Sequence, residues 1–282
     1  MTRPEDRRQL DPGDFRRERA YLADHCFATV PASGESRSKM VDQEAWESMM
    51  DLPTDVLLRT TESLGDMVSD MHDQWSGWIE VWPDEPAKAP FMFDATLDAA
   101  DEFAAGPFIA ACGWYRPAYA ALRNALEGMT VAAGFAVRGD STALAEWRAG
   151  TREAKFGNAL DFLQADQRLS QIDARLGGDG LFRRKPPGIL EEAYAHLCNY
   201  AHSRPGYTNV DAWQGSNGPV FIPKVFIQFW TDFCDTVALS YVLLAVGWSG
   251  ATPPEAARPL FGWADQRWHG LGSAIESEFF PK

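Results

Sequence analysis

Three charged side chains interrupt a long uncharged stretch, and their spacing would place them on one face of a helix. Between residues 103 and 137 only Arg116, Arg123 and Glu127 carry charge. At about 100° per residue, positions seven and four residues apart fall on the same side of an α-helix. Burying charge is costly unless the charges are paired or line a cavity. The stripe therefore indicates either a structural ion-pair network or a polar pocket for an anion or a planar group, since arginine suits both.

A histidine stands at the end of a later predicted helix, over 188–202. His202 lies at the border between the apolar face and the surface of this helix, just before Pro205. Its imidazole could act as a general acid or base, or it could bond a neighbouring element and lock the helix end. The segment 203–222 is rich in turn residues and long for a connector, which favours a functional loop. We therefore predict His202, Arg123 and Glu127 as catalytic candidates, and as binding candidates Arg116, Tyr194, Asn199, Arg204 and Asn217.

Other chemistries find less support in the residue patterns. The basic run 183–185 could meet a phosphate, although such runs are more often solvated loops. His72, between two aspartates, fits a solvated residue better than a metal ligand. Glu192 and His196 are four residues apart rather than the three of di-iron bundles, and no phosphate-loop, nucleophile-elbow or zincin motif occurs. We therefore expect no metal and no cofactor.

The composition restricts partners and compartment. Twenty-six Lys and Arg against 40 Asp and Glu give a net charge of −14, which repels a phosphate backbone. This charge disfavours nucleic acid but does not exclude it, because a small pocket need not follow the net charge. The four cysteines are far apart, as expected for reduced thiols, and the start of the chain lacks an apolar signal core. The apolar run 236–248 is shorter than a membrane span, so we expect a cytoplasmic protein.

Helical periodicity dominates the chain and predicts its organisation. The most apolar segment, 224–248, is hydrophobic on nearly every side and should lie at the centre of a bundle. We predict an all-α protein, an antiparallel helical bundle with peripheral short helices. Residues 1–40 would be a charged flexible arm, 41–250 the bundle, and 251–282 a helical tail that packs on the bundle or on a partner. The expected helices cover 43–51, 55–82, 94–105, 106–137, 141–148, 151–165, 188–202 and 224–248, with one or two more after 253.

Two stretches resemble the bacterial HEPN-like helical-bundle superfamily, in particular its abortive-infection-related branches. They are WYRPAYAALRNALEG, Trp114–Gly128, and AYAHLCNYAHSRP, Ala193–Pro205, within a likeness that covers residues 94–248. The resemblance implies an antiparallel bundle, often a homodimer, and a role in bacterial defence or a toxin–antitoxin system. Nuclease members carry an arginine about four to six residues before a histidine. Here no arginine stands at those positions before His202, and Arg204 follows it, which argues against ribonuclease activity.

Three functions remain open from the sequence. The first is binding of a protein partner or small ligand in a pocket formed by Arg116, Arg123, Glu127 and His202, with the segment 203–222 as a lid. The second is an RNA-cleaving or nucleotide-transferring enzyme in which His202 is the acid or base and an arginine stabilises phosphate charge. The third is a structural subunit of an oligomer with Trp263 and Trp268 at its interface. We take binding as the leading hypothesis.

Overall fold

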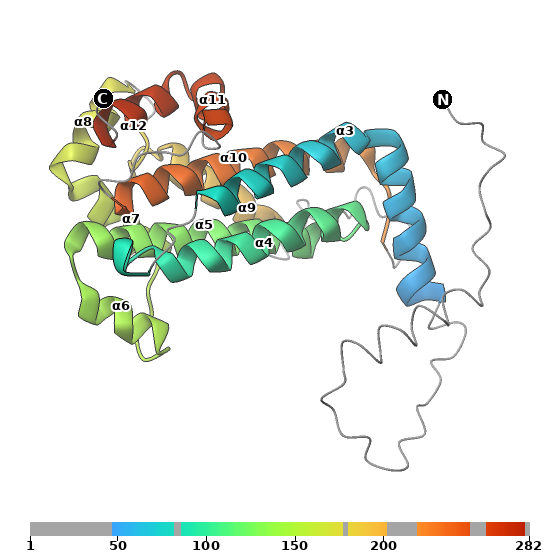
Figure 1. The fold of residues 1–282 in the computed structure, drawn as a ribbon, viewed down its shortest axis with the longest axis horizontal. Coiled ribbons are helices and arrows are strands. Elements are labelled where there is room, and N and C mark those ends of the chain that lie inside the picture. Colours follow the sequence, from blue (N-terminus) through green and yellow to red (C-terminus); the bar gives the residue numbers. More distant parts are fainter. Residues whose placement is uncertain (1–46, 82–85, 177–179, 202–218, 249–257, 280–282) are drawn as a thin grey trace, which may run out of the picture. The chain divides into compact units, whose positions relative to one another are not determined.

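Helices account for nearly all of the structure. The computed structural model describes residues 47–81, 86–176, 180–201, 219–248 and 258–279, and these five stretches contain no strand. Four long helices, α3, α4, α5 and α10, lie side by side, with shorter helices around one end (Figure 1). The prediction of an all-α antiparallel bundle is therefore confirmed.

Some helix boundaries follow the sequence patterns closely, whereas others differ, such as the helix predicted over 151–165, which begins only at Phe156. The helix predicted over 141–148 is found without a change of boundary, and the central apolar helix is displaced by one residue at each end. The elements in chain order are a π-helical turn η2 (Glu47–Asp51), α3 (Leu52–Glu80), a 3₁₀ turn η3 (Pro86–Lys88), α4 (Phe93–Ala111), α5 (Tyr115–Arg138), α6 (Ser141–Arg148), α7 (Phe156–Ala165), α8 (Gln167–Arg175), α9 (Ile189–Ala201), α10 (Pro223–Gly247), α11 (Arg258–Arg267) and α12 (Leu271–Phe279).

The prediction of a helix break at Gly106 and Pro107 was wrong. Helix α4 continues through Pro107 to Ala111, and Gly106 is buried beside Ala121 of α5 and Phe229 of α10. The break comes instead at Gly113, whose φ of 86° is left-handed and favours glycine. Helices α4 and α5 are therefore antiparallel neighbours joined by a short turn.

Helices α5 and α10 form the centre of the bundle. From Asp232 to Val246 every residue of α10 is buried, and α5 packs against α4, α7, α9 and α10. Of the described helices, only α10 is long and apolar enough to cross a membrane, and most of its length is buried within the protein. A buried central helix, as the sequence predicted, accounts for this apolar character.

The C-terminal helices α11 and α12 pack at the end of the bundle where the other short helices lie (Figure 1). Helix α11 packs on α10, and α12 packs on α10, α11 and α8. Arg175 of α8 bonds Ser277 and Glu278 of α12. The C-terminal helices thus pack on the same bundle as the helices before them.

Candidate functional site

The three predicted charges of α5 lie on the side of the helix that meets α9. Arg123 Nη2 is 2.8 Å from Glu127 Oε2, one turn further along the helix. The same Nη2 donates a hydrogen bond of 2.9 Å to the hydroxyl oxygen of Tyr194 on α9. The structure therefore brings together Arg123, Glu127 and Tyr194, three of the residues predicted from the sequence.

This cluster is partly buried. The side chains of Arg123 and Glu127 are 23% and 28% exposed, and Tyr194 stacks on Phe156 of α7 with ring centroids 3.8 Å apart. Burial opposes the charge on Arg123, but hydrogen bonds to Cys198 and Tyr194 and the nearby Glu127 carboxylate outweigh it and raise the guanidinium pKa. Burial also raises the pKa of Tyr194. Arg123 is thus a permanent cation between two helices.

One nitrogen atom of the Arg123 side chain takes no part in these contacts. The Nε of Arg123 is buried and has no hydrogen-bond partner in the structure. A buried donor without an acceptor costs about 1–3 kcal/mol, so the cluster is not fully satisfied by its own residues. An incompletely bonded arginine is compatible with both the pocket and the ion-pair interpretations of the sequence.

Of the other predicted site residues, the structure describes only Arg116 and Asn199. Arg116 Nε donates to the backbone carbonyl of Ala201, the last residue of α9, at 3.3 Å. Asn199 is half-buried on α9. The predicted acid–base residue His202 and the predicted binding residues Arg204 and Asn217 lie outside the described residues.

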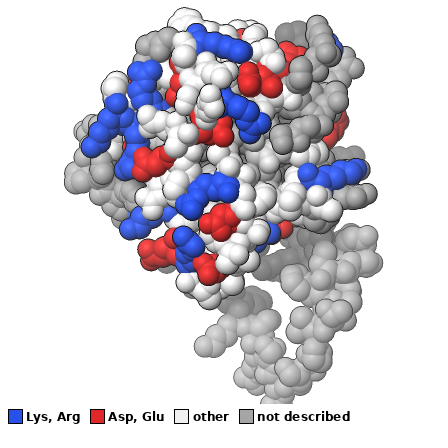
Figure 2. All heavy atoms as spheres, turned by 90° about the vertical axis from the view of Figure 1, so that its left-hand side faces the viewer, with Lys and Arg blue, Asp and Glu red and all other residues white. Residues whose placement is uncertain are grey.

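The basic run 183–185 lies against the start of α7. Arg184 forms an ion pair of 2.8 Å with Asp161, and its guanidinium occupies the space that a side chain at Gly157 would take. The face of the molecule in Figure 2 shows basic and acidic side chains next to each other rather than a separate basic surface. Arg184 of this run therefore takes part in a local ion pair.

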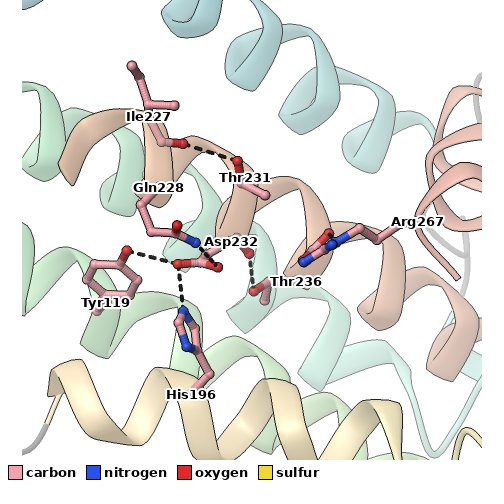
Figure 3. A network of polar contacts seen from close by, with 9 residues as sticks. Tyr119, His196, Ile227, Gln228, Thr231, Asp232, Thr236 and Arg267 are labelled. Carbon is pink, nitrogen blue, oxygen red and sulfur yellow. Dashed lines mark hydrogen bonds and ion pairs between the residues drawn. The ribbon is translucent and has the colours of Figure 1, made fainter. Parts of the chain in front are cut away.

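A second polar cluster, which the sequence analysis did not predict, links α5, α9 and α10. Its centre is Asp232 of α10 (Figure 3). One carboxylate oxygen, Oδ2, accepts a hydrogen bond of 2.9 Å from the Tyr119 hydroxyl and lies 3.0 Å from His196 Nε2. The other oxygen accepts a hydrogen bond of 3.0 Å from the Gln228 amide. Three helices thus meet at one carboxylate.

Burial differs sharply between the two ends of the histidine contact. The Asp232 side chain is 7% exposed, whereas that of His196 is 41% exposed. The hydrogen bond to Asp232 raises the pKa of His196, against the opposing effect of burial. No described residue bonds the second ring nitrogen, and Tyr200 meets the ring edge-on. The arrangement holds a titratable imidazole at the surface by means of a buried anion.

Tyr119 belongs to the same cluster. Its ring stacks on Tyr200 at 4.2 Å and meets Phe229 edge-on. Burial and the neighbouring Asp232 carboxylate raise its pKa far above the ordinary value. Tyr119 is therefore a neutral hydrogen-bond donor at all physiological pH values.

A second carboxylate of α10 lies one turn further along. Asp235 Oδ1 accepts a hydrogen bond of 2.9 Å from the Trp263 indole, and Arg267 Nε lies 3.0 Å from Oδ2. Both partners come from α11. The Trp263 ring also meets Trp230 edge-on, so this predicted interface residue has partners within its own chain.

The missed residues had a signal in the sequence. Asp232 and Asp235 are acidic residues in the most apolar helix, and burying them requires partners, as was argued for Arg123. The spacing of His196 from Glu192 indicated only that the two residues do not form a di-iron motif. No group of three or more potential metal ligands occurs among the described residues. In this part of the chain His196 is a titratable side chain near the surface, and Arg123 is a partly exposed cation.

Comparison with known proteins adds no relative to this description. No family model, curated protein or solved structure matches the chain.

Proposed function

We propose that this protein acts by binding, and that its binding face lies where α5 meets α9, at Arg123, Glu127 and Tyr194. The ligand would be a small molecule or a protein partner that presents an anionic or planar group. The observation that supports this proposal most directly is that Arg123 remains 23% exposed and is held by an adjacent helix. Its guanidinium is therefore oriented before any ligand arrives, which lowers the entropic cost of binding.

The chemistry of the three side chains suits such a ligand. A guanidinium binds carboxylates and phosphates in a fixed geometry and stacks on flat groups. Glu127 pairs with Arg123 and its side chain is 28% exposed, so a ligand anion could replace it without burying an unpaired charge. Tyr194, stacked on Phe156, provides a rigid neighbour for the ligand.

Titration with two probes, inorganic phosphate and benzoate, tests this proposal. We expect each to raise the unfolding temperature of the wild type, since a ligand that binds only the folded state stabilises it. Arg123→Ala should remove the shift. Arg138→Ala is the matched control, because Arg138 is an exposed arginine at the end of the same helix and should leave the shift intact.

Two results would overturn the proposal. Equal probe shifts in the wild type and in Arg123→Ala would place binding elsewhere. A loss of stability in Arg123→Ala, without any probe shift in the wild type, would make the cluster a structural ion pair.

A second candidate function is RNA cleavage or nucleotide transfer with His202 as the acid or base. One observation favours it: Arg116 bonds the carbonyl of Ala201, so the charged face of α5 reaches the residue directly before His202. The resemblance to HEPN-like proteins would connect either function with bacterial defence, but the missing arginine before His202 argues against the ribonuclease form of this candidate. Cleavage of a labelled RNA by the wild type and His72→Ala, but not by His202→Ala, would support this function. Absence of wild-type cleavage would reject the ribonuclease form of this candidate.

A further inference from the structure

We propose that the contact between His196 and Asp232 is a proton-controlled latch, which holds the second half of α9 against α10 at low pH and weakens as the pH rises. The geometry that carries this inference is a half-exposed imidazole bound to a buried carboxylate on a different helix. The latch adds a regulatory element that is independent of whether the Arg123 face binds a ligand.

The described contacts of α9 show why this histidine is special. Tyr194 bonds Arg123 and stacks on Phe156, Tyr200 stacks on Tyr119, and the carbonyl of Ala201 accepts from an arginine. None of these groups changes charge near neutral pH, because tyrosine and arginine titrate far above it. His196 is therefore the titratable tie between α9 and its neighbours near neutral pH.

The groups that face the imidazole set its response. Asp232 favours the charged form through its hydrogen bond and its charge, Asp235 adds a smaller effect in the same direction, and Arg267 of α11 opposes it. From α5 the facing group is Tyr119, which reaches the same carboxylate and stays neutral. On α9 itself Tyr200 meets the ring. Acidic neighbours thus outweigh the basic one, and the pKa of His196 is raised.

The direction of the switch follows from this raised pKa. Below the pKa, His196 is an imidazolium and forms an ion pair with Asp232. Above it, the neutral ring keeps at most one weaker hydrogen bond, since charge-assisted bonds are about twice as strong as neutral ones. The tie between the helices therefore weakens as the pH rises through the folded-state pKa.

The carboxylate can release the histidine at little cost. Tyr119 and Gln228 continue to donate to Asp232 when His196 moves away. The buried anion then retains two hydrogen bonds and is not left bare, which would otherwise oppose opening. The histidine is the replaceable partner of this carboxylate.

Hydrogen exchange of the full-length protein, followed in peptides from α9, tests the latch. We expect exchange in α9, corrected for the intrinsic effect of pH, to rise about twofold between about pH 6 and about pH 8.5, since an ion pair at a half-exposed side chain shifts an opening equilibrium by only a small factor. His196→Gln keeps a neutral donor at every pH and should abolish this pH response. The matched control is His72→Gln, because His72 is 67% exposed beside Asp73 and should leave the response of α9 unchanged.

Each outcome of these experiments either supports or overturns the latch. Protection of α9 that is equal at both pH values in the wild type would overturn the proposal, as would the same pH response in His196→Gln and the wild type. If His196→Gln failed to fold, NMR of the wild type would decide. The amide signals of α9 should titrate with the midpoint of the His196 ring, and midpoints that differ would reject the latch. None of these measurements involves a ligand, so they do not depend on the binding function.

Discussion

The two carboxylates of α10, Asp232 and Asp235, lie one helical turn apart and are both largely buried, yet they are satisfied by different kinds of partner. Asp232 accepts from a tyrosine, a glutamine and a histidine that come from three helices. Asp235 is bonded by the indole of Trp263 and by the permanent cation Arg267, both from α11.

This difference shows which parts of the bundle can respond to pH near neutrality. The charge of Arg267 does not change, so α11 is held on α10 in the same way across the physiological range. Burial raises the pKa of Asp235, and the hydrogen bond from Trp263 and the charge of Arg267 oppose this rise. On the side of α9, the titratable partner of Asp232 makes the contact depend on protonation.

The largest effect should come from removing the Asp232 carboxylate. Asp232→Ala leaves the buried Tyr119 hydroxyl without its acceptor and removes the partner of His196, whereas the exposed Gln228 amide regains water. We therefore expect a loss of about 2–3 kcal/mol in the free energy of unfolding. Urea denaturation measures this loss. A loss below that of the corresponding change at Asp235 would contradict the central position of Asp232.

Asp235→Ala should cost less, about 1–2 kcal/mol. Its partner Arg267 is half-exposed and regains water when the carboxylate is removed, so only the Trp263 indole is left without an acceptor. The same urea measurement applies, and the fluorescence of the tryptophans should report the altered environment of Trp263. A cost equal to that of Asp232→Ala would remove the distinction between the two carboxylates.

Tyr119→Phe isolates one hydrogen bond of the Asp232 cluster. The ring and its stacking on Tyr200 remain, and only the donor to Asp232 is lost, so we expect a destabilisation of about 1 kcal/mol. Unfolding at two pH values would sharpen the comparison. Because one fewer donor then supports the carboxylate, the variant should depend more strongly than the wild type on a protonated His196.

The smallest expected effect is the pH dependence of stability itself. The folded-state pKa of His196 is raised above 6.5, so its stabilisation is fully present below about pH 6.5 and is lost as the pH rises through the folded-state value. Solvent at the half-exposed ring reduces this contribution to about 0.5 kcal/mol. Unfolding free energies at about pH 6 and pH 9 should differ by this amount in the wild type and in His72→Gln, but not in His196→Gln. An equal difference in all three proteins would assign it to other groups.

The fold could be predicted because it depends on local patterns. Helical spacing of apolar residues placed α10 within one residue of each boundary and α6 without error. The break at Gly106 and Pro107 was predicted wrongly because a Gly-Pro pair inside a packed helix has the same local sequence as one that ends a helix. The neighbours of Gly106, Ala121 and Phe229, come from other helices and are not visible in the local sequence.

The candidate site could be predicted only in part. The spacing of Arg123 and Glu127 within one helix fixed their ion pair, since residues four apart share a face. Tyr194 was included as a binding candidate, and it bonds Arg123. His196 and Asp232 are 36 residues apart in the sequence and lie on two different helices, and no periodicity in the sequence specifies which two helices meet. The buried acids of α10 were nevertheless visible as charges that required partners.

Titration of the His196 ring by NMR, in the wild type and in Asp232→Asn, tests the account most directly. Asparagine preserves the shape and an acceptor for Tyr119 but removes the negative charge. We expect the pKa of His196 to lie above its ordinary value in the wild type and to fall in the variant, because the largest cause of the shift is then lost and burial still opposes the charge. An unchanged pKa in Asp232→Asn would show that the carboxylate does not control the histidine, and the proposed difference between the two sides of α10 would then be wrong.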